Sequence, residues 1–174
     1  MNSLVEAAVK TYLENAKHPG MKVGKIEMLA LQLQLTVRLP RWYVKLLLKY
    51  PLAGIYLDYP AYEPDIDIES DGFVSLRIAR PRDIISETEK CYPGLAIRKL
   101  GYACLATDPT GGGDPYFIKV SEGDDPPVYQ VYHDISEIGS VVEAEGMQKI
   151  ANSLSELFSK ARVNNYHNPS GDPL

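Results

Sequence analysis

Hydrophobic residues in the first 50 positions recur every three or four residues, which is the spacing of one face of an α-helix. In the second stretch of this kind, Ile26, Leu29 and Leu33 are expected to face the inside of the protein. Prolines and glycines separate the periodic stretches from one another. The pattern predicts three helices, over residues 3–17, 24–35 and 40–50.

After Pro51 the period shortens to two, the pattern of strands with one buried face. Six strands are expected, over residues 55–59, 65–69, 73–78, 102–107, 116–120 and 128–132. Two further helices are expected, over 83–91 and 142–161. The residues predicted to face inward in the second of these helices are Met147, Ile150, Leu154, Leu157 and Phe158. This order predicts an α+β fold, with a mainly antiparallel sheet of about six strands packed against N-terminal helices and a C-terminal helix.

Length and composition predict an ordinary intracellular domain. The 174 residues are 45% hydrophobic and 24% charged, with a net charge of −5. We expect one domain over residues 1–163 and a flexible tail over 164–174, with no membrane span and a cytoplasmic location. Cys91 and Cys104 lack the spacing of a zinc site and are expected to be reduced and mostly buried.

Three motifs resemble catalytic or metal-binding motifs without completing them. The glycine-rich segment 108–115 lacks the lysine of a phosphate-binding loop, so it is interpreted as a turn between strands. Residues 67–72 match the start of a calcium loop, but Ile78 stands where the bidentate Glu belongs, which leaves at most a weak cation site between Asp67 and Asp71. His133 and Asp134 are adjacent on a strand and point to opposite faces. We expect no catalytic residue, no metal and no cofactor.

Charge is unevenly distributed along the chain. Residues 1–57 contain eight basic and three acidic residues, whereas residues 58–174 contain ten basic and twenty acidic residues. An acidic balance argues against nucleic acid as the partner, because phosphate contacts require clustered Lys and Arg. The acidic segments are either solvated faces or a surface that binds a basic protein. The candidate partner-binding residues are Asp65, Asp67, Glu69, Asp71, Asp114, Glu122, Asp124 and Asp125.

Five segments, in order, resemble the SUKH superfamily, which unites bacterial toxin-immunity proteins with a fungal regulator of cell-wall synthesis. The first is LPRWYVKLLLKY at residues 39–50, which is similar to the Leu-Pro-x-x-Tyr segment of that family. The others are YPG at 92–94, GDPYFI at 113–118, PPVYQVYHD at 126–134 and IANSLSELF at 150–158. Leu154 replaces the usual Phe of the closing helix.

The resemblance covers residues 22–160 and implies an α+β fold that binds a protein rather than catalysing a reaction. We expect a cytosolic immunity protein that neutralises a cognate toxin domain, a basic nuclease, through its acidic surface. The first alternative is a regulatory interaction scaffold with no toxin partner. The second is a metal-dependent hydrolase that uses the acids between Asp67 and Asp71. The sequence does not specify an oligomeric state.

Overall fold

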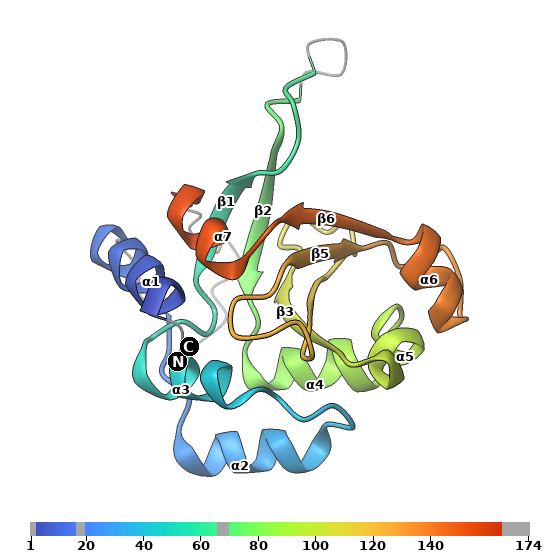
Figure 1. The fold of residues 1–174 in the computed structure, drawn as a ribbon, viewed down its shortest axis with the longest axis horizontal. Coiled ribbons are helices and arrows are strands. Elements are labelled where there is room, and N and C mark those ends of the chain that lie inside the picture. The colour runs from blue at the N-terminus through green and yellow to red at the C-terminus, as the bar shows by residue number, and fades with distance from the viewer. Residues whose placement is uncertain (1–2, 17–19, 66–69, 165–174) are drawn as a thin grey trace.

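A computed structural model describes residues 3–16, 20–65 and 70–164. The helices are α1 (Ser3–Asn15), α2 (Lys25–Gln34), α3 (Arg41–Lys49), α4 (Pro81–Glu89), α5 (Gly94–Ile97), α6 (Gly139–Glu145) and α7 (Leu154–Lys160), with a 3-10 turn, η1, at Arg98–Leu100. The strands are β1 (Tyr56–Pro60), β2 (Phe73–Ile78), β3 (Tyr102–Thr107), β4 (Tyr116–Lys119), β5 (Val128–Val131), β6 (Met147–Ala151) and β7 (Arg162–Val163). The α+β class and the antiparallel sheet are confirmed (Figure 1).

The strands form one curled antiparallel sheet in the order β6-β5-β4-β3-β2-β1-β7. From β1 to β6 each strand pairs with its neighbour in sequence, so the sheet is a meander. Strand β7 then returns to pair with β1, with Leu57 opposite Val163. The two edge strands of the sheet, β6 and β7, therefore both come from the segment 147–163. Helix α7 lies between them in the sequence and contacts β1 and β6.

Helices cover the sheet and share one hydrophobic core with it. Helix α4 packs on β3, and α1 packs against α7 (Figure 1). Leu57, Leu76 and Phe117 on the strands are fully buried beside helical residues such as Leu47 and Ile84. Burying side chains of this size contributes roughly 1.5–3 kcal/mol each, which is the main stabilisation of such a fold.

The predicted single helix over 142–161 is wrong. The structure has α6, then β6, then α7 in that stretch. Strand β6 pairs with β5, with Lys149 opposite Tyr129, and so satisfies backbone groups that β5 would otherwise leave open. Gly146 ends α6, and the Ser153 hydroxyl accepts from the backbone N–H of Glu156 to start α7. The predicted inward residues Ile150, Leu154, Leu157 and Phe158 are nevertheless buried, and Met147 is partly buried.

The predicted orientation of the second helix is also wrong. Helix α2 buries Met28 and Leu31 against the body of the protein, whereas Ile26, Leu29 and Leu33 are exposed. The sequence of α2 is apolar on two sides, so its periodicity fits either orientation. Packing of α2 on α3 and α4 decides between them.

Of the two cysteines, which are both free, Cys104 is buried as expected and Cys91 is exposed. Among the described residues, no helix has the length and apolar character needed to cross a membrane.

Candidate functional site

The acidic segment after β1 forms a hairpin connection that extends beyond the rest of the molecule (Figure 1). Glu63, Asp65 and Asp71 are exposed on this connection. Its two arms are joined by paired backbone hydrogen bonds between Asp65 and Ser70, at 2.9 and 2.8 Å. We call the two described arms of this connection, residues 61–65 and 70–72, the acidic hairpin. The candidates Asp67 and Glu69, most of the predicted strand 65–69 and part of the possible cation site lie outside the described residues.

The base of the acidic hairpin is held by Arg162 of β7. One guanidinium nitrogen lies 3.1 Å from a carboxylate oxygen of Asp71, and another lies 3.6 Å from Asp58. The same guanidinium stacks over the Phe73 ring, with its carbon 3.7 Å from the ring centroid. The hairpin is thus fixed to the edge strand by charge and by an aromatic contact.

Asp114 lies at the same end of the sheet as the acidic hairpin. Strands β1 and β3 run in the same direction because each is antiparallel to β2, so the connections that follow them leave at one end. Asp114, in the connection after β3, accepts a hydrogen bond from the backbone N–H of His133, at 3.1 Å. Its carboxylate also lies 2.7 Å from Nδ1 of the His133 ring and raises the pKa of that ring.

The other three candidates lie at the opposite end, because β4 runs against β3 and the connection after β4 leaves there. The Asp125 carboxylate accepts from the backbone N–H and the hydroxyl of Ser155, at 2.8 and 2.6 Å. Glu122 accepts from the Tyr129 hydroxyl at 3.2 Å. Asp124 is exposed and lines a shallow hollow with the basic residues Arg41 and Lys45 of α3. The six candidates that the structure describes therefore form two groups.

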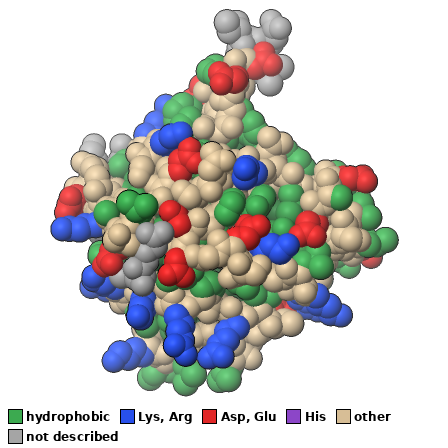
Figure 2. Space-filling model, viewed as in Figure 1, with side chains coloured by type: hydrophobic (Ala, Val, Ile, Leu, Met, Phe, Trp, Pro, Cys, Tyr) green, Lys and Arg blue, Asp and Glu red, His purple; other side chains and the backbone are tan. Residues whose placement is uncertain are grey.

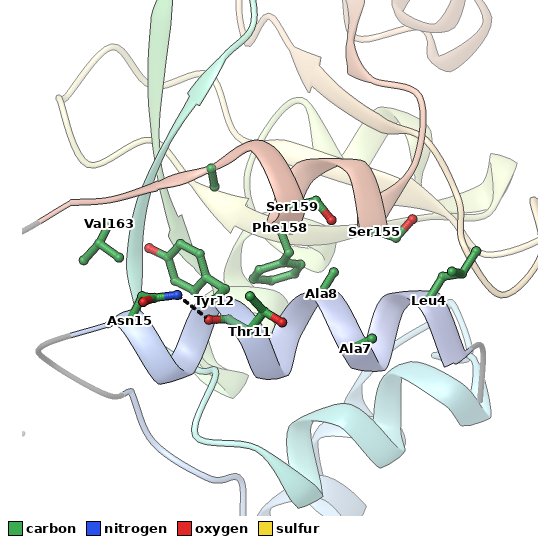
Figure 3. Close-up of a pocket in the computed structure, with 11 residues that line it drawn as sticks. Leu4, Ala7, Ala8, Thr11, Tyr12, Asn15, Ser155, Phe158, Ser159 and Val163 are labelled. Carbon is green, nitrogen blue, oxygen red and sulfur yellow. Dashed lines mark hydrogen bonds between the residues drawn. The ribbon is translucent and has the colours of Figure 1, made fainter.

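A groove between α1 and α7 (Figure 3) has a volume of about 410 Å³. Its wall contains Tyr12 and Phe158, whose rings meet edge to face with centroids 5.8 Å apart. The Tyr12 hydroxyl donates to the backbone carbonyl of Tyr56, at 2.8 Å. Sequence reasoning missed this groove, because its two walls come from opposite ends of the chain.

Sequence reasoning also missed the partners of the acidic residues. His133 pairs with Asp114, 19 positions away, rather than acting with its neighbour Asp134. Arg162 lies 91 positions from Asp71. Neither contact has a local sequence signal, because strand register brings the residues together. Among the described residues, no three His, Cys, Asp or Glu side chains meet in an arrangement that could hold a metal ion.

A comparison with protein families decides which family this fold represents. The model of the SMI1 / KNR4 family (SUKH-1) matches residues 23–160. The chain belongs to the SUKH-1 family. Comparisons with curated proteins and with solved structures found no match. Membership in SUKH-1 is consistent with an immunity-type or a regulatory function.

The first of the SUKH-1 segments recognised in the sequence contributes to the core. Residues 39–50 include α3, where Trp42, Tyr43, Leu46 and Leu47 are buried. The Trp42 ring N–H donates to the backbone carbonyl of Gly123, at 3.1 Å, and so joins α3 to the connection after β4. These SUKH-1 residues maintain the fold, and the exposed positions around them are those available to a partner.

Proposed function

We propose that this SUKH-1 protein binds and neutralises a cognate toxin domain, a basic nuclease, and that the acidic hairpin makes the main contact. The proposed contact residues are Asp65, Asp67, Glu69 and Asp71, together with Asp114 at the same end of the sheet. Glu122 and Asp124 form a second acidic group at the other end. The two oxygens of Asp125 already accept from Ser155, which favours a role for this residue in the fold.

The observation that supports the proposal most is the projection of the acidic hairpin from the body of the molecule (Figure 1). Between Asp58 and Leu76 the chain carries six acidic residues and no basic residue. A nuclease contacts phosphates with clustered Lys and Arg in a concave site. A narrow acidic projection can enter such a site, and charges of this kind increase the rate of encounter with a basic protein.

Calorimetric titration with a toxin domain encoded by a neighbouring gene, at low and moderate salt, tests the proposal. The test variant combines Asp65→Asn, Asp67→Asn and Glu69→Gln, and the matched control combines Glu122→Gln with Asp124→Asn at the opposite end. We expect tight binding that weakens as salt rises. Stopped-flow measurements should give an association rate about tenfold lower for the test variant at low salt, with the control close to the unmodified protein.

Two other results have different meanings. If binding is tight and neither salt nor the substitutions of the test variant change it, the immunity role is supported, but the interface lies outside the acidic hairpin. Failure to bind the toxin domain contradicts the immunity role, and it favours the alternative of a regulatory interaction scaffold.

A further inference from the structure

Helix α2 carries an apolar stripe on its outer side. Ile26, Leu29 and Leu33 are 86%, 62% and 78% exposed, and they follow one another at the three- and four-residue spacing of a single helix face. Ala30, beside them, is exposed as well. The helix already buries Met28 and Leu31 on its inner side, so the stripe plays no part in the core. Three large aliphatic side chains exposed together on one helix are typical of an interaction surface.

The stripe is bordered by positive charge on the face that Figure 2 shows. Figure 2 shows hydrophobic side chains along the lower edge of the molecule, over α2, with Lys and Arg side chains in a band directly above them, over α3. Between Gly20 and Leu57 the sequence has six basic residues and one acidic residue. Five of these basic residues are exposed and make no ion pair with any described residue: Lys22, Lys25, Arg38, Arg41 and Lys45.

Two carboxylates on or beside α2 already have partners. Glu27 on α2 accepts from the backbone N–H of Gly24 at 3.3 Å and caps the helix. Glu89 accepts from the backbone N–H and hydroxyl of Thr36, just after α2, and forms an ion pair with Arg98 at 2.7 Å. Asp124 lines the same hollow as Arg41 and Lys45 and offsets part of their charge, but basic residues remain in excess beside the stripe. This excess attracts carboxylates from outside.

We infer that the exposed face of α2 binds an acidic amphipathic helix of another protein, with aliphatic residues against the stripe and carboxylates toward the surrounding Lys and Arg. A helix that lies in such a position uses residues at the same three- and four-residue spacing. A second copy of this chain is a poor occupant, because a twofold contact through α2 would set the same basic surface against itself. This surface is separate from the acidic hairpin. The acidic hairpin is proposed to bind a basic protein, whereas the exposed face of α2 would bind an acidic one.

Two synthetic peptides test the inference with the full chain. Both are about 20 residues long, with leucines at helical spacing. One carries Glu at the flanking positions, and the other carries Lys at the same positions. Each is titrated into isotope-labelled protein, and binding is mapped by changes in amide chemical shift. We expect the Glu peptide to bind at least about tenfold more tightly than the Lys peptide and to shift amides within residues 20–45.

Matched variants separate the stripe from other exposed apolar residues. Leu29→Ser should weaken the Glu peptide at least about fivefold. Ile138→Ser should have no effect, although Ile138 is 61% exposed and so matches Leu29. The double variant Arg41→Gln and Lys45→Gln should reduce the preference for the Glu peptide. Circular dichroism confirms that each variant is folded.

Four results overturn the inference. The first is equal affinity for the two peptides, and the second is a set of chemical-shift changes centred on the groove between α1 and α7. The third is binding of the Glu peptide by the Leu29→Ser variant with the affinity of the unmodified protein. The fourth is no binding at peptide concentrations up to about 1 mM. A dimer of the chain alone that Leu29→Ser dissociates in sedimentation equilibrium also overturns it, because the occupant is then a second copy.

Discussion

The Asp125 carboxylate holds the first turn of α7 in place through Ser155. One carboxylate oxygen accepts from the Ser155 backbone N–H at 2.8 Å, and the other accepts from its hydroxyl at 2.6 Å. The first turn of a helix has backbone N–H groups without intrahelical partners. A carboxylate at this position accepts a hydrogen bond from one of them and interacts favourably with the positive end of the helix dipole. The contact joins the connection after β4 to a helix 30 positions later.

This contact gives the first prediction. Asp125→Ala should lower the free energy of unfolding by about 1–2 kcal/mol, because a helix cap and a charge-assisted hydrogen bond are lost together. Asp124→Ala, at the exposed neighbouring position, should change it by less than about 0.5 kcal/mol. Urea-induced unfolding followed by circular dichroism measures both. Equal effects of the two substitutions would show that Asp125 does not act as a cap.

The second prediction concerns the close approach of α4 and α5. A Cβ atom at Gly94 would overlap the backbone carbonyl of Glu87, and the backbone cannot move aside as a flexible side chain can. Gly94→Ala should therefore cost about 3 kcal/mol or more. Gly24, the residue before α2, is the matched control, because a Cβ there has no neighbour within 4 Å. Gly24→Ala should cost under about 1 kcal/mol, and thermal unfolding compares the two.

The third prediction is a pH dependence at the end of the sheet that carries the acidic hairpin. The hydrogen bond that the His133 ring donates to the Asp114 carboxylate raises the pKa of His133 above its ordinary value of 6.5, so the folded state favours the protonated ring. The resulting stabilisation is complete below pH 6.5 and is lost as the pH rises through the higher folded-state pKa. The stability difference between the unmodified protein and His133→Asn should be larger at about pH 5.5 than at about pH 8.5.

Urea unfolding at the two pH values measures this difference, and proton NMR of the His133 ring follows its titration directly. Asp114→Asn should lower the pKa of the ring toward its ordinary value, because the carboxylate is replaced by a neutral amide. A ring that titrates at the same pH in both proteins would show that Asp114 is not the cause.

The fourth prediction concerns the base of the acidic hairpin. Arg162→Met keeps an unbranched side chain over Phe73 but removes the contacts with Asp58 and Asp71. We expect faster amide hydrogen exchange at residues 70–74, with global stability lowered by less than about 1 kcal/mol because the ion pair is largely exposed. Lys160→Met is the matched control, since it removes an exposed ion pair with Glu156 on α7. Unchanged exchange in Arg162→Met contradicts a role in holding the hairpin.

The fold class and most strands were predictable because their signals are local. The alternation at residues 73–78 corresponds to β2, the apolar run predicted as a strand at 102–107 corresponds to β3, and the glycine-rich segment 108–115 lies between two strands as expected. The helix over 142–161 was not predictable from periodicity. Its apolar residues suit a helix, and the strand in its middle forms because the edge of β5 is available for pairing.

The orientation of α2 and the grouping of the acidic residues depended on long-range packing. Ile26 and Leu29 fit the inner face of a helix as well as Met28 and Leu31 do, so only the docking of α2 on its neighbours could choose. The separation of Asp114 from Asp125 follows from strand direction, which the sequence does not state. The acidic composition was visible in the sequence, but its division between two ends of the sheet was not.

The placement of β6 and β7 at opposite edges has a consequence for synthesis of the protein. A nascent chain that has emerged only as far as Gly146 contains the five central strands but neither edge strand. The hydrogen-bonding groups of β5 and of β1 then lack their final partners at the same time, and unpaired edges of this kind favour association with other chains. The 17 residues from Met147 to Val163 close both edges when they leave the ribosome. Premature termination near Gly146 therefore produces an aggregation-prone fragment.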